Sequence, residues 1–297
     1  MKWRGRGGGG LIEDRRGAGG LSGGGFPLPM GKAGGGGIGL IILLVIYLLV
    51  GGLPGGGGGL GVDPGTGALP QAPEPTEAEL KKAPADDPAK FVDFVAGDVD
   101  ATWKKIFAQS GKTYEQPVIV LYDNGGVSTA CGNAPSTVGP FYCPNDRKVY
   151  LDIAFMNELQ QRLGAQGDFA QAYIVAHEIG HHVQNQLGVM KDVNLAQQED
   201  PGSANDLSVR LELQADCLAG IWAHSAVQQA DLLETGDLDE ALNAAAAVGD
   251  DRIQKQSGGQ VNPDTFTHGS GEQRVKWFKA GFQSGDPTAC DTFKGDV

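Results

Sequence analysis

The 297-residue chain contains 48 glycines and carries a formal net charge of −13. This length fits one well-buried domain with appendages, and because most of the glycine excess lies before residue 70, the sequence predicts a low-complexity front and a single folded domain. Residues 1–50 contain six basic and two acidic residues, so they carry +4 and the remainder carries −17. Such an acidic domain without a Lys/Arg stripe repels phosphate backbones, which excludes nucleic acid as a partner.

An uncharged apolar run, Ile38–Val50, lies within the glycine-rich front. With its flanks it covers residues 34–53, about 20 residues, which is the length of a helix that spans a bilayer. A buried core helix or a cleaved signal peptide fits less well, because the run has no polar face and no clear cleavage site. The positive-inside bias then predicts a basic cytoplasmic tail at 1–33 and a single-pass, uncleaved signal-anchor helix at 34–53 in the cytoplasmic (inner) membrane.

Residues 54–86 are rich in Gly and Pro and predict a flexible linker. Residues 87–297 then form the folded domain, placed in the periplasm or outside the cell. A helix is expected from Asp87 to Gly111, followed by strands at Pro117–Tyr122 and Lys148–Ile153. Further helices are expected near 154–163, 168–187, 206–229, 237–256 and 271–283. Strands followed by a run of helices indicate an α+β domain.

Four cysteines follow the apolar run, on the side where disulfides would persist. Cys131 and Cys143 flank a Gly/Pro-rich loop and are expected to pair, which leaves Cys217 to pair with Cys290. A four-thiolate zinc site is the alternative, but no spacing is C-x₂-C. Cys217 as an unpaired core residue is a second alternative.

The segment Tyr173–Leu187 (YIVAHEIGHHVQNQL) contains an H-E-x-x-H pattern on a predicted helix. Residues four apart lie on one helical face, so His177 and His181 can bind one metal ion, and zinc accepts neutral imidazoles. Glu178 projects beside that face, where it can accept a proton from a water at the metal. His182 is rotated by about 100° from His181 and is expected to hydrogen-bond locally rather than bind metal.

A catalytic zinc site needs a third protein ligand and an open position. The sequence offers Glu212 and Asp216, four apart on one face of a predicted helix. Glu212 is the predicted third ligand. Asp216 is predicted to accept the free N–H of a ligand histidine and so fix its tautomer. The alternative is a solvated acidic face, because Asp and Glu are abundant in this chain.

The pattern HEIGHH followed by ELQAD resembles the gluzincin metallopeptidases, whose third ligand is a Glu on a later helix. More closely, and over nearly its whole length, the chain resembles the bacterial family of putative neutral zinc metallopeptidases. This resemblance implies a zincin/gluzincin-like α+β domain, mostly helical with a small sheet. The matching segments are MKWRGR, EDRRG, CGNAPSTVGPFYCPNDRKVYLD, AHEIGHHVQNQLG, ELQADCLAGIWA and THGSGEQRVKWF. The glycine-rich stretches at 7–10 and 34–37 depart from the family pattern, away from the site.

The stretch Thr267, His268 and Gly269, with Arg274, is similar to a T-H-P…R stretch of membrane-bound gluzincins. The similarity implies that His268 and Arg274 are catalytic residues, because an imidazole or guanidinium near the scissile carbonyl would stabilise an oxyanion. The alternative is that His268 caps or packs and that Arg274 pairs with a surface acid. The sequence leaves both interpretations open.

Together these residues predict a zinc-dependent endopeptidase with one Zn²⁺ per chain, which acts on protein or peptide substrates and is attached to the membrane by one N-terminal helix. Zinc held by His177, His181 and Glu212 would activate a water, with Glu178 as general base. An edge of the strand Lys148–Ile153 is expected to pair with an extended substrate. The alternative function is a non-catalytic, zinc-stabilised envelope binding or scaffold protein, which the presence of Glu178 disfavours.

Overall fold

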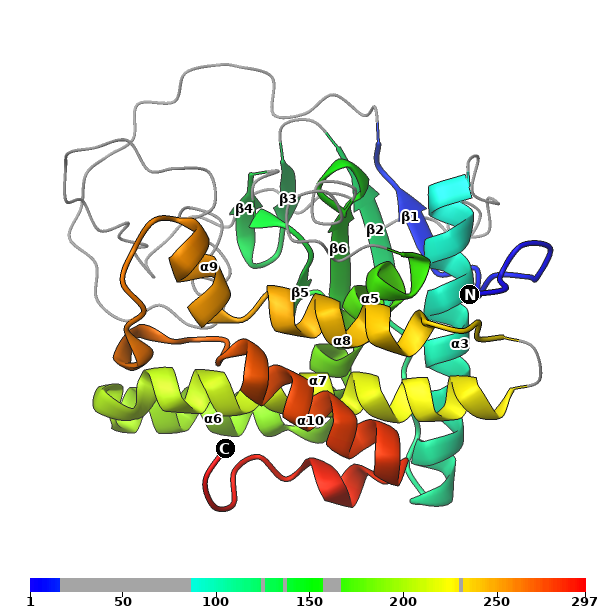
Figure 1. Ribbon diagram of the computed structural model, residues 1–297. Helices are drawn as coiled ribbons and strands as arrows, with labels where there is room; N and C mark the ends of the chain where they lie inside the picture. The colour runs from blue at the N-terminus through cyan, green and yellow to red at the C-terminus, as the bar shows by residue number, and fades with distance from the viewer. Residues whose placement is uncertain (17–86, 124–125, 136–137, 157–166, 230–231) are drawn as a thin grey trace.

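The computed structural model describes residues 1–16, 87–123, 126–135, 138–156, 167–229 and 232–297. Its strands are β1 (Ile12–Asp14), β2 (Val118–Tyr122), β3 (Val127–Thr129), β4 (Gly132–Ala134), β5 (Phe141–Cys143) and β6 (Lys148–Asp152). Its α-helices are α3 (Asp87–Gln109), α5 (Asp168–Leu187), α6 (Val189–Glu199), α7 (Ala204–Gln228), α8 (Asp237–Ala247), α9 (Asp250–Gln256) and α10 (Gly271–Ser284). The sheet lies above a layer of helices, with α3 along one side (Figure 1).

The main sheet is mixed and has the strand order β1-β2-β6-β5. β1 and β6 run parallel to β2, and β5 runs antiparallel to β6. Successive side chains of a strand point to opposite faces of the sheet, and in β2 both sets of side chains are buried. Ile119 and Leu121 join the core formed with the helices, whereas Val120 and Tyr122 join a smaller cluster beside the β3–β4 hairpin.

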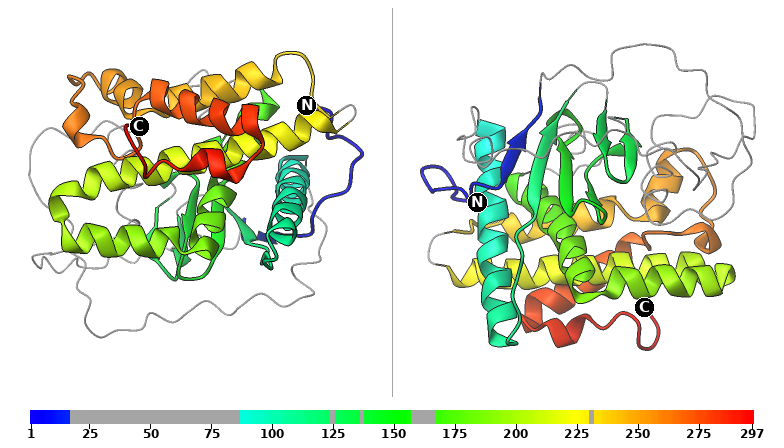
Figure 2. Two further views of the ribbon diagram at one scale, coloured as in Figure 1. Left: turned by 90° about the horizontal axis from the view of Figure 1, so that it is seen from below. Right: turned by 180° about the vertical axis from the view of Figure 1, so that it is seen from behind.

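The helical layer is centred on α7, which packs against both α5 and α10 (Figures 1 and 2). α7 and α10 approach each other backbone to backbone. A Cβ on Gly220 would lie 2.1 Å from the carbonyl oxygen of Phe278, and one on Gly281 would lie 1.9 Å from that of Cys217. Glycine at both positions therefore lets the two helices pack at a distance that any side chain would prevent.

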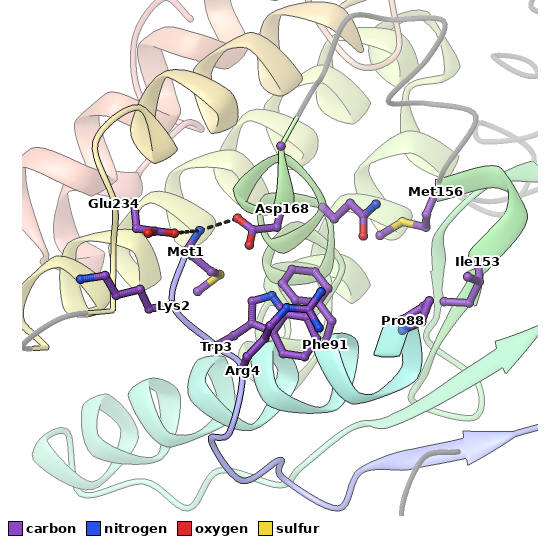
Figure 3. A pocket seen from close by; sticks show the side chains of 12 residues that line it. Met1, Lys2, Trp3, Arg4, Pro88, Phe91, Ile153, Met156, Asp168 and Glu234 are labelled. Atoms are coloured by element: carbon purple, nitrogen blue, oxygen red, sulfur yellow. Dashed lines mark hydrogen bonds and ion pairs between the residues drawn. The ribbon is translucent and has the colours of Figure 1, made fainter. Parts of the chain in front are cut away.

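The first residues of the chain are part of this fold. The Met1 ammonium, which is fully buried, lies 2.6 Å from Asp168 Oδ1 at the start of α5 and 3.2 Å from Asp237 Oδ1 at the start of α8. Trp3 packs edge-on against Phe91 of α3, and these residues form one wall of a cavity of about 880 Å³ (Figure 3). The segment before residue 17 is therefore anchored to three helices.

The predicted membrane arrangement is wrong. β1 is hydrogen-bonded to β2 in the sheet of the domain, with Ile12 opposite Ile119. Residues on opposite sides of a bilayer cannot pair in this way, so a cytoplasmic tail and an extracytoplasmic domain are incompatible with the fold. No helix of the described ranges is long and apolar enough to cross a membrane. The expected anchor at 34–53 and linker at 54–86 fall outside those ranges.

Several predicted elements are found with small changes. α3, β2, β6, α5, α7 and α10 lie where the sequence placed helices and strands. The predicted helix at 237–256 is two helices, α8 and α9, and most of the predicted helix at 154–163 lies outside the described residues. The segment that we expected to be a substrate-binding edge is β6, which lies between β2 and β5. β6 therefore has no free edge.

Both predicted disulfide pairings are present. Cys131, in the turn of the β3–β4 hairpin, is bonded to Cys143 at the end of β5. Cys217 on α7 is bonded to Cys290, the last residue of the short helix η4 (Pro287–Cys290). The first bond connects the hairpin to the main sheet, and the second holds the C-terminal segment against α7.

Candidate metal centre

The two histidines of the H-E-x-x-H pattern lie on α5, which is buried along most of its length. The helix ends where Gly188 adopts φ 84°, a left-handed conformation that glycine takes readily. His177 and His181 are one turn apart, with ring centroids 4.8 Å from each other. Gly180, between them, allows α5 to approach α7, because its Cβ position lies 3.1 Å from the Ala215 carbonyl oxygen.

Each of these histidines has its Nδ1 atom engaged by another side chain. His177 Nδ1 lies 2.9 Å from Asp216 Oδ1, and His181 Nδ1 lies 2.8 Å from Gln184 Oε1. Because a carboxylate and an amide oxygen accept hydrogen bonds, both Nδ1 atoms carry the proton in the neutral rings. Nε2 of each ring is then free to act as a metal ligand. Gln184 is itself held by Leu211, whose carbonyl oxygen accepts from its Nε2 atom at 2.7 Å.

Both Nε2 atoms face Glu212 on α7. Glu212 Oε2 is 3.1 Å from His177 Nε2, and Glu212 Oε1 is 3.4 Å from His181 Nε2. Each of the three residues offers a ligand atom within 4.8 Å of the others, and all three are buried. The edge of a zinc tetrahedron with bonds of about 2.0–2.1 Å is about 3.3 Å. These spacings therefore suit zinc.

The electrostatics of the three residues favour a positive charge between them. Burial alone would raise the pKa of Glu212, but His181 and His177 hold it well below its ordinary value. Burial disfavours the imidazolium form of His177, yet Asp216 and Glu212 raise its pKa to about 9. Two carboxylates beside two imidazoles thus stabilise a cation at this point, as a divalent metal would require.

Glu178 lies next to the cluster without belonging to it. Its side chain is buried, and its Oε2 atom has no hydrogen-bond partner among the described residues. Burial raises the pKa of this carboxyl group, while His181 and His177 act in the opposite direction. A buried carboxylate oxygen without a partner is costly, and such atoms are found where a ligand or water binds. Glu178 is therefore free to receive a proton at Oε2.

His268 lies in the loop before α10 and is held by Asp250, the first residue of α9. His268 Nδ1 is 3.2 Å from Asp250 Oδ1, and Asp250 Oδ2 accepts from the backbone N–H groups of Thr267, His268 and Gly269. His268 is also among the groups that lower the pKa of Glu212. Asp250 was not among the residues predicted from the sequence.

Arg274 is not directed at an open position. Its Nε and Nη2 atoms donate to the two oxygens of Asp216 at 2.8 and 3.0 Å, and its Nη1 atom donates to the Val248 carbonyl oxygen at 3.2 Å. Nη2 also donates to the Tyr173 hydroxyl at 3.2 Å. Arg274 is 4% exposed. Of the two sequence interpretations, a surface ion pair is excluded by this burial, and the four bonds named here use four of the five N–H groups of the guanidinium.

Two further polar groups belong to the structure rather than to the candidate site. His182 hydrogen-bonds to the Glu115 carbonyl oxygen at 2.7 Å and to the Tyr142 hydroxyl at 3.1 Å, both distant in sequence. Another cluster, formed by the acidic residues Asp168, Asp237 and Glu240, also has the spacing of a metal site. Two of its members already contact the Met1 ammonium, so it is occupied by a cation of the chain itself.

Sequence reasoning missed three residues that contact the site: Tyr173, Gln184 and Asp250. Tyr173 and Gln184 had a signal, because they lie four residues before His177 and three after His181, on the same face of α5. Asp250 had none, since its contact with His268 crosses 18 positions of the chain.

Two helices thus bring two histidines and a glutamate to one point, with a second glutamate beside them, which is the ligand and base set of a zinc metallopeptidase. A family model described as "putative neutral zinc metallopeptidase" matches residues 1–293, and the chain belongs to this family. The predicted family membership is confirmed.

Two relatives illustrate the extent of the similarity. "Uncharacterized protein YpfJ" of Escherichia coli (strain K12) is 47% identical over 299 residues, which cover 99% of either chain. "Uncharacterized protein Rv2575" of Mycobacterium tuberculosis (strain ATCC 25618 / H37Rv) is 46% identical over 255 residues, which cover 79% of this chain and 84% of that protein. No solved structure matches the chain.

Proposed function

We propose that this protein is a zinc-dependent endopeptidase that hydrolyses peptide bonds in protein or peptide substrates, with one zinc ion per chain. The observation that carries the proposal is the buried cluster of His177, His181 and Glu212, whose ligand atoms lie within 4.8 Å of one another. Beside it lies a carboxylate oxygen of Glu178 that has no hydrogen-bond partner in the part of the chain that the structure describes. A non-catalytic zinc site has no use for that oxygen.

His177 and His181 through Nε2, and Glu212 through its carboxylate, would hold the zinc ion. When bound, zinc would polarise the scissile carbonyl and make the attacking water more acidic. Asp216 and Gln184 keep the two imidazoles in the tautomer that leaves Nε2 available.

Glu178 acts as the general base and then as the general acid. Its Oε2 atom accepts the proton of the attacking water and then delivers it to the nitrogen of the leaving amine. The position of Glu178 on α5, next to His177, keeps its carboxylate beside the ligands without making it one of them.

His268 is the group that we assign to the developing oxyanion. Asp250 accepts the Nδ1 proton of His268 and so orients Nε2 away from α9. A protonated imidazole held in this way can donate from Nε2 to the carbonyl oxygen as negative charge develops there.

The test is Glu178→Gln, assayed with casein and a peptide library while zinc content is measured in parallel. The amide has the shape of the carboxylate but cannot accept the proton, so kcat should fall by about 10²–10⁴-fold while KM and zinc content stay nearly unchanged. The matched control is Glu199→Gln, the same change at an exposed position at the end of α6.

Three outcomes would count against the proposal. If Glu178→Gln keeps full activity, Glu178 is not the base. If it loses its zinc, the residue is a ligand. If the wild type is fully zinc-loaded and cleaves no member of the library, the non-catalytic scaffold function replaces the peptidase.

A further inference from the structure

The carboxylate of Asp216 accepts hydrogen bonds from side chains of two other helices. It lies on α7, is fully buried, and accepts from His177 Nδ1 and the Tyr173 hydroxyl, both on α5. From α10 it accepts two bonds from Arg274. We propose that Arg274 and Tyr173 are positioning residues that hold Asp216 against His177 and so fix His177 as a zinc ligand, rather than residues that contact the substrate. This inference rests on the zinc site of the proposed function but not on peptide hydrolysis.

The engagement of the guanidinium supports this role. Nε and Nη2 of Arg274 form a two-pronged contact with both oxygens of Asp216, at 2.8 and 3.0 Å. Nη1 donates to the Val248 carbonyl oxygen at 3.2 Å, so all three nitrogens have acceptors. Bidentate pairing of this kind is the strongest geometry available to an arginine and a carboxylate. With the bond to the Tyr173 hydroxyl, these contacts use four of the five N–H groups of the guanidinium.

The burial of Asp216 makes the loss of Arg274 costly. A carboxylate with no exposed surface has no water to replace a lost partner. Arg274 supplies two of the donors to this carboxylate, at 2.8 and 3.0 Å. The guanidinium therefore holds the carboxylate beside His177 Nδ1, and this acceptor fixes the tautomer that presents Nε2 to a metal.

Tyr173 completes the contact. It lies one helical turn before His177 and is 1% exposed. Its hydroxyl donates to Asp216 Oδ1 and accepts from Arg274 Nη2 at 3.2 Å. Because the hydroxyl has both a donor and an acceptor role, it connects the carboxylate and the guanidinium and limits rotation of either.

Zinc affinity distinguishes positioning from a substrate contact. We would measure it by competition with a chelator for the wild-type protein, Arg274→Met and Tyr173→Phe, with the melting temperature recorded for each. We expect zinc to bind about 10–100-fold more weakly in both variants, as is usual when a group that orients a ligand is removed. Arg274→Lys, which keeps the charge but not the two-pronged contact, should recover only part of the affinity.

The matched control is Tyr150→Phe. Tyr150 is 1% exposed and its hydroxyl donates to Asp146 at 2.7 Å, but its ring lies in the apolar cluster beside the β3–β4 hairpin. The same chemical change there should leave zinc affinity unchanged.

Unchanged zinc affinity in Arg274→Met and Tyr173→Phe, with a loss confined to kcat, would overturn the inference and restore an oxyanion role for Arg274. Should Arg274→Met fail to fold, Tyr173→Phe decides alone, because it removes only one oxygen atom and is the smaller change to the buried contacts. A wild type that binds zinc but hydrolyses no peptide would overturn the proposed function and leave this inference standing.

Discussion

At the scale of single residues, the site separates histidines that have similar sequence surroundings. His177, His181 and His182 lie within six positions of one helix, yet only the first two present Nε2 to Glu212. His182 faces the loop before β2 and the edge strand β5, where Glu115 and Tyr142 bind its two nitrogens. A rotation of about 100° per residue is enough to separate a candidate ligand from a structural residue.

His268 and Asp250 give a prediction at this scale. His268→Ala should lower kcat by about 10²–10³-fold, since it removes a donor to the oxyanion. Asp250→Asn should also lower kcat, because the three backbone N–H groups of residues 267–269 keep the amide oxygen at the Oδ2 position. The NH₂ group then faces His268 Nδ1 and cannot accept its proton. Peptide hydrolysis by the wild type, both single variants and the double variant is the measurement.

The coupling of the two residues is the decisive result. If Asp250 acts through His268, Asp250→Asn should change kcat little in the His268→Ala background. Equal losses from Asp250→Asn in both backgrounds would show that Asp250 only supports the fold of the 267–269 loop, whose backbone N–H groups it also binds.

At the scale of elements, the close packing of α7 and α10 positions Arg274 beside Asp216. Gly220 and Gly281 remove the side chains that would separate the two helices. The division of the predicted helix at 237–256 into α8 and α9 also helps to position Arg274. Gly249 passes so close to Gly271 that a Cβ would lie 2.1 Å from the Gly271 nitrogen, and the carbonyl oxygen of Val248 accepts from Arg274.

Gly281→Ala tests this packing. The added methyl group meets the Cys217 backbone at 1.9 Å, so α10 must shift, and the free energy of unfolding should fall by about 1–3 kcal/mol. Zinc affinity should fall with it, because Arg274 moves with α10. Gly7→Ala is the control, since, apart from its chain neighbours, no atom of the described residues lies within 4 Å of its Cβ position. Chemical denaturation and chelator competition measure both effects, and an unaltered stability would contradict the packing argument.

At the scale of the whole molecule, the fold closes around its own first residues. β1 completes one edge of the sheet, and a buried ion pair between Glu13 and Lys148 of β6 spans the strand between them at 3.2 Å. Residues before and after the undescribed range 17–86 therefore form one core, which the composition of the front did not suggest.

Ile12→Ala measures the contribution of this segment. Ile12 is 3% exposed and packs in the main core, so the substitution should lower the free energy of unfolding by about 2–4 kcal/mol. If the segment before residue 17 were a detached tail, the substitution would not change the free energy of unfolding. Leu195→Ala is the control, because that side chain is 47% exposed and its loss should cost less than about 0.5 kcal/mol. Urea denaturation of the whole chain decides between the two.

The sequence by itself determined the elements whose pattern is local. The α5 boundaries agree with the predicted 168–187, because the apolar periodicity continues up to Gly188. The same periodicity placed Glu212 and Asp216 on one face of α7. The H-E-x-x-H spacing also needed no tertiary information. The loop between Cys131 and Cys143 predicted one disulfide, whereas the structure decided that Cys217 pairs with Cys290.

Only the tertiary structure decided the features that depend on contacts between distant segments. β1 and β5 are three residues long and carry no periodic signal of their own, so their places in the sheet depend on β2 and β6. The sequence left Arg274 open between an oxyanion contact and a surface ion pair, and its partner Asp216 is 58 positions away. Local patterns report which face of a helix is buried, whereas the choice of partner depends on how the helices pack.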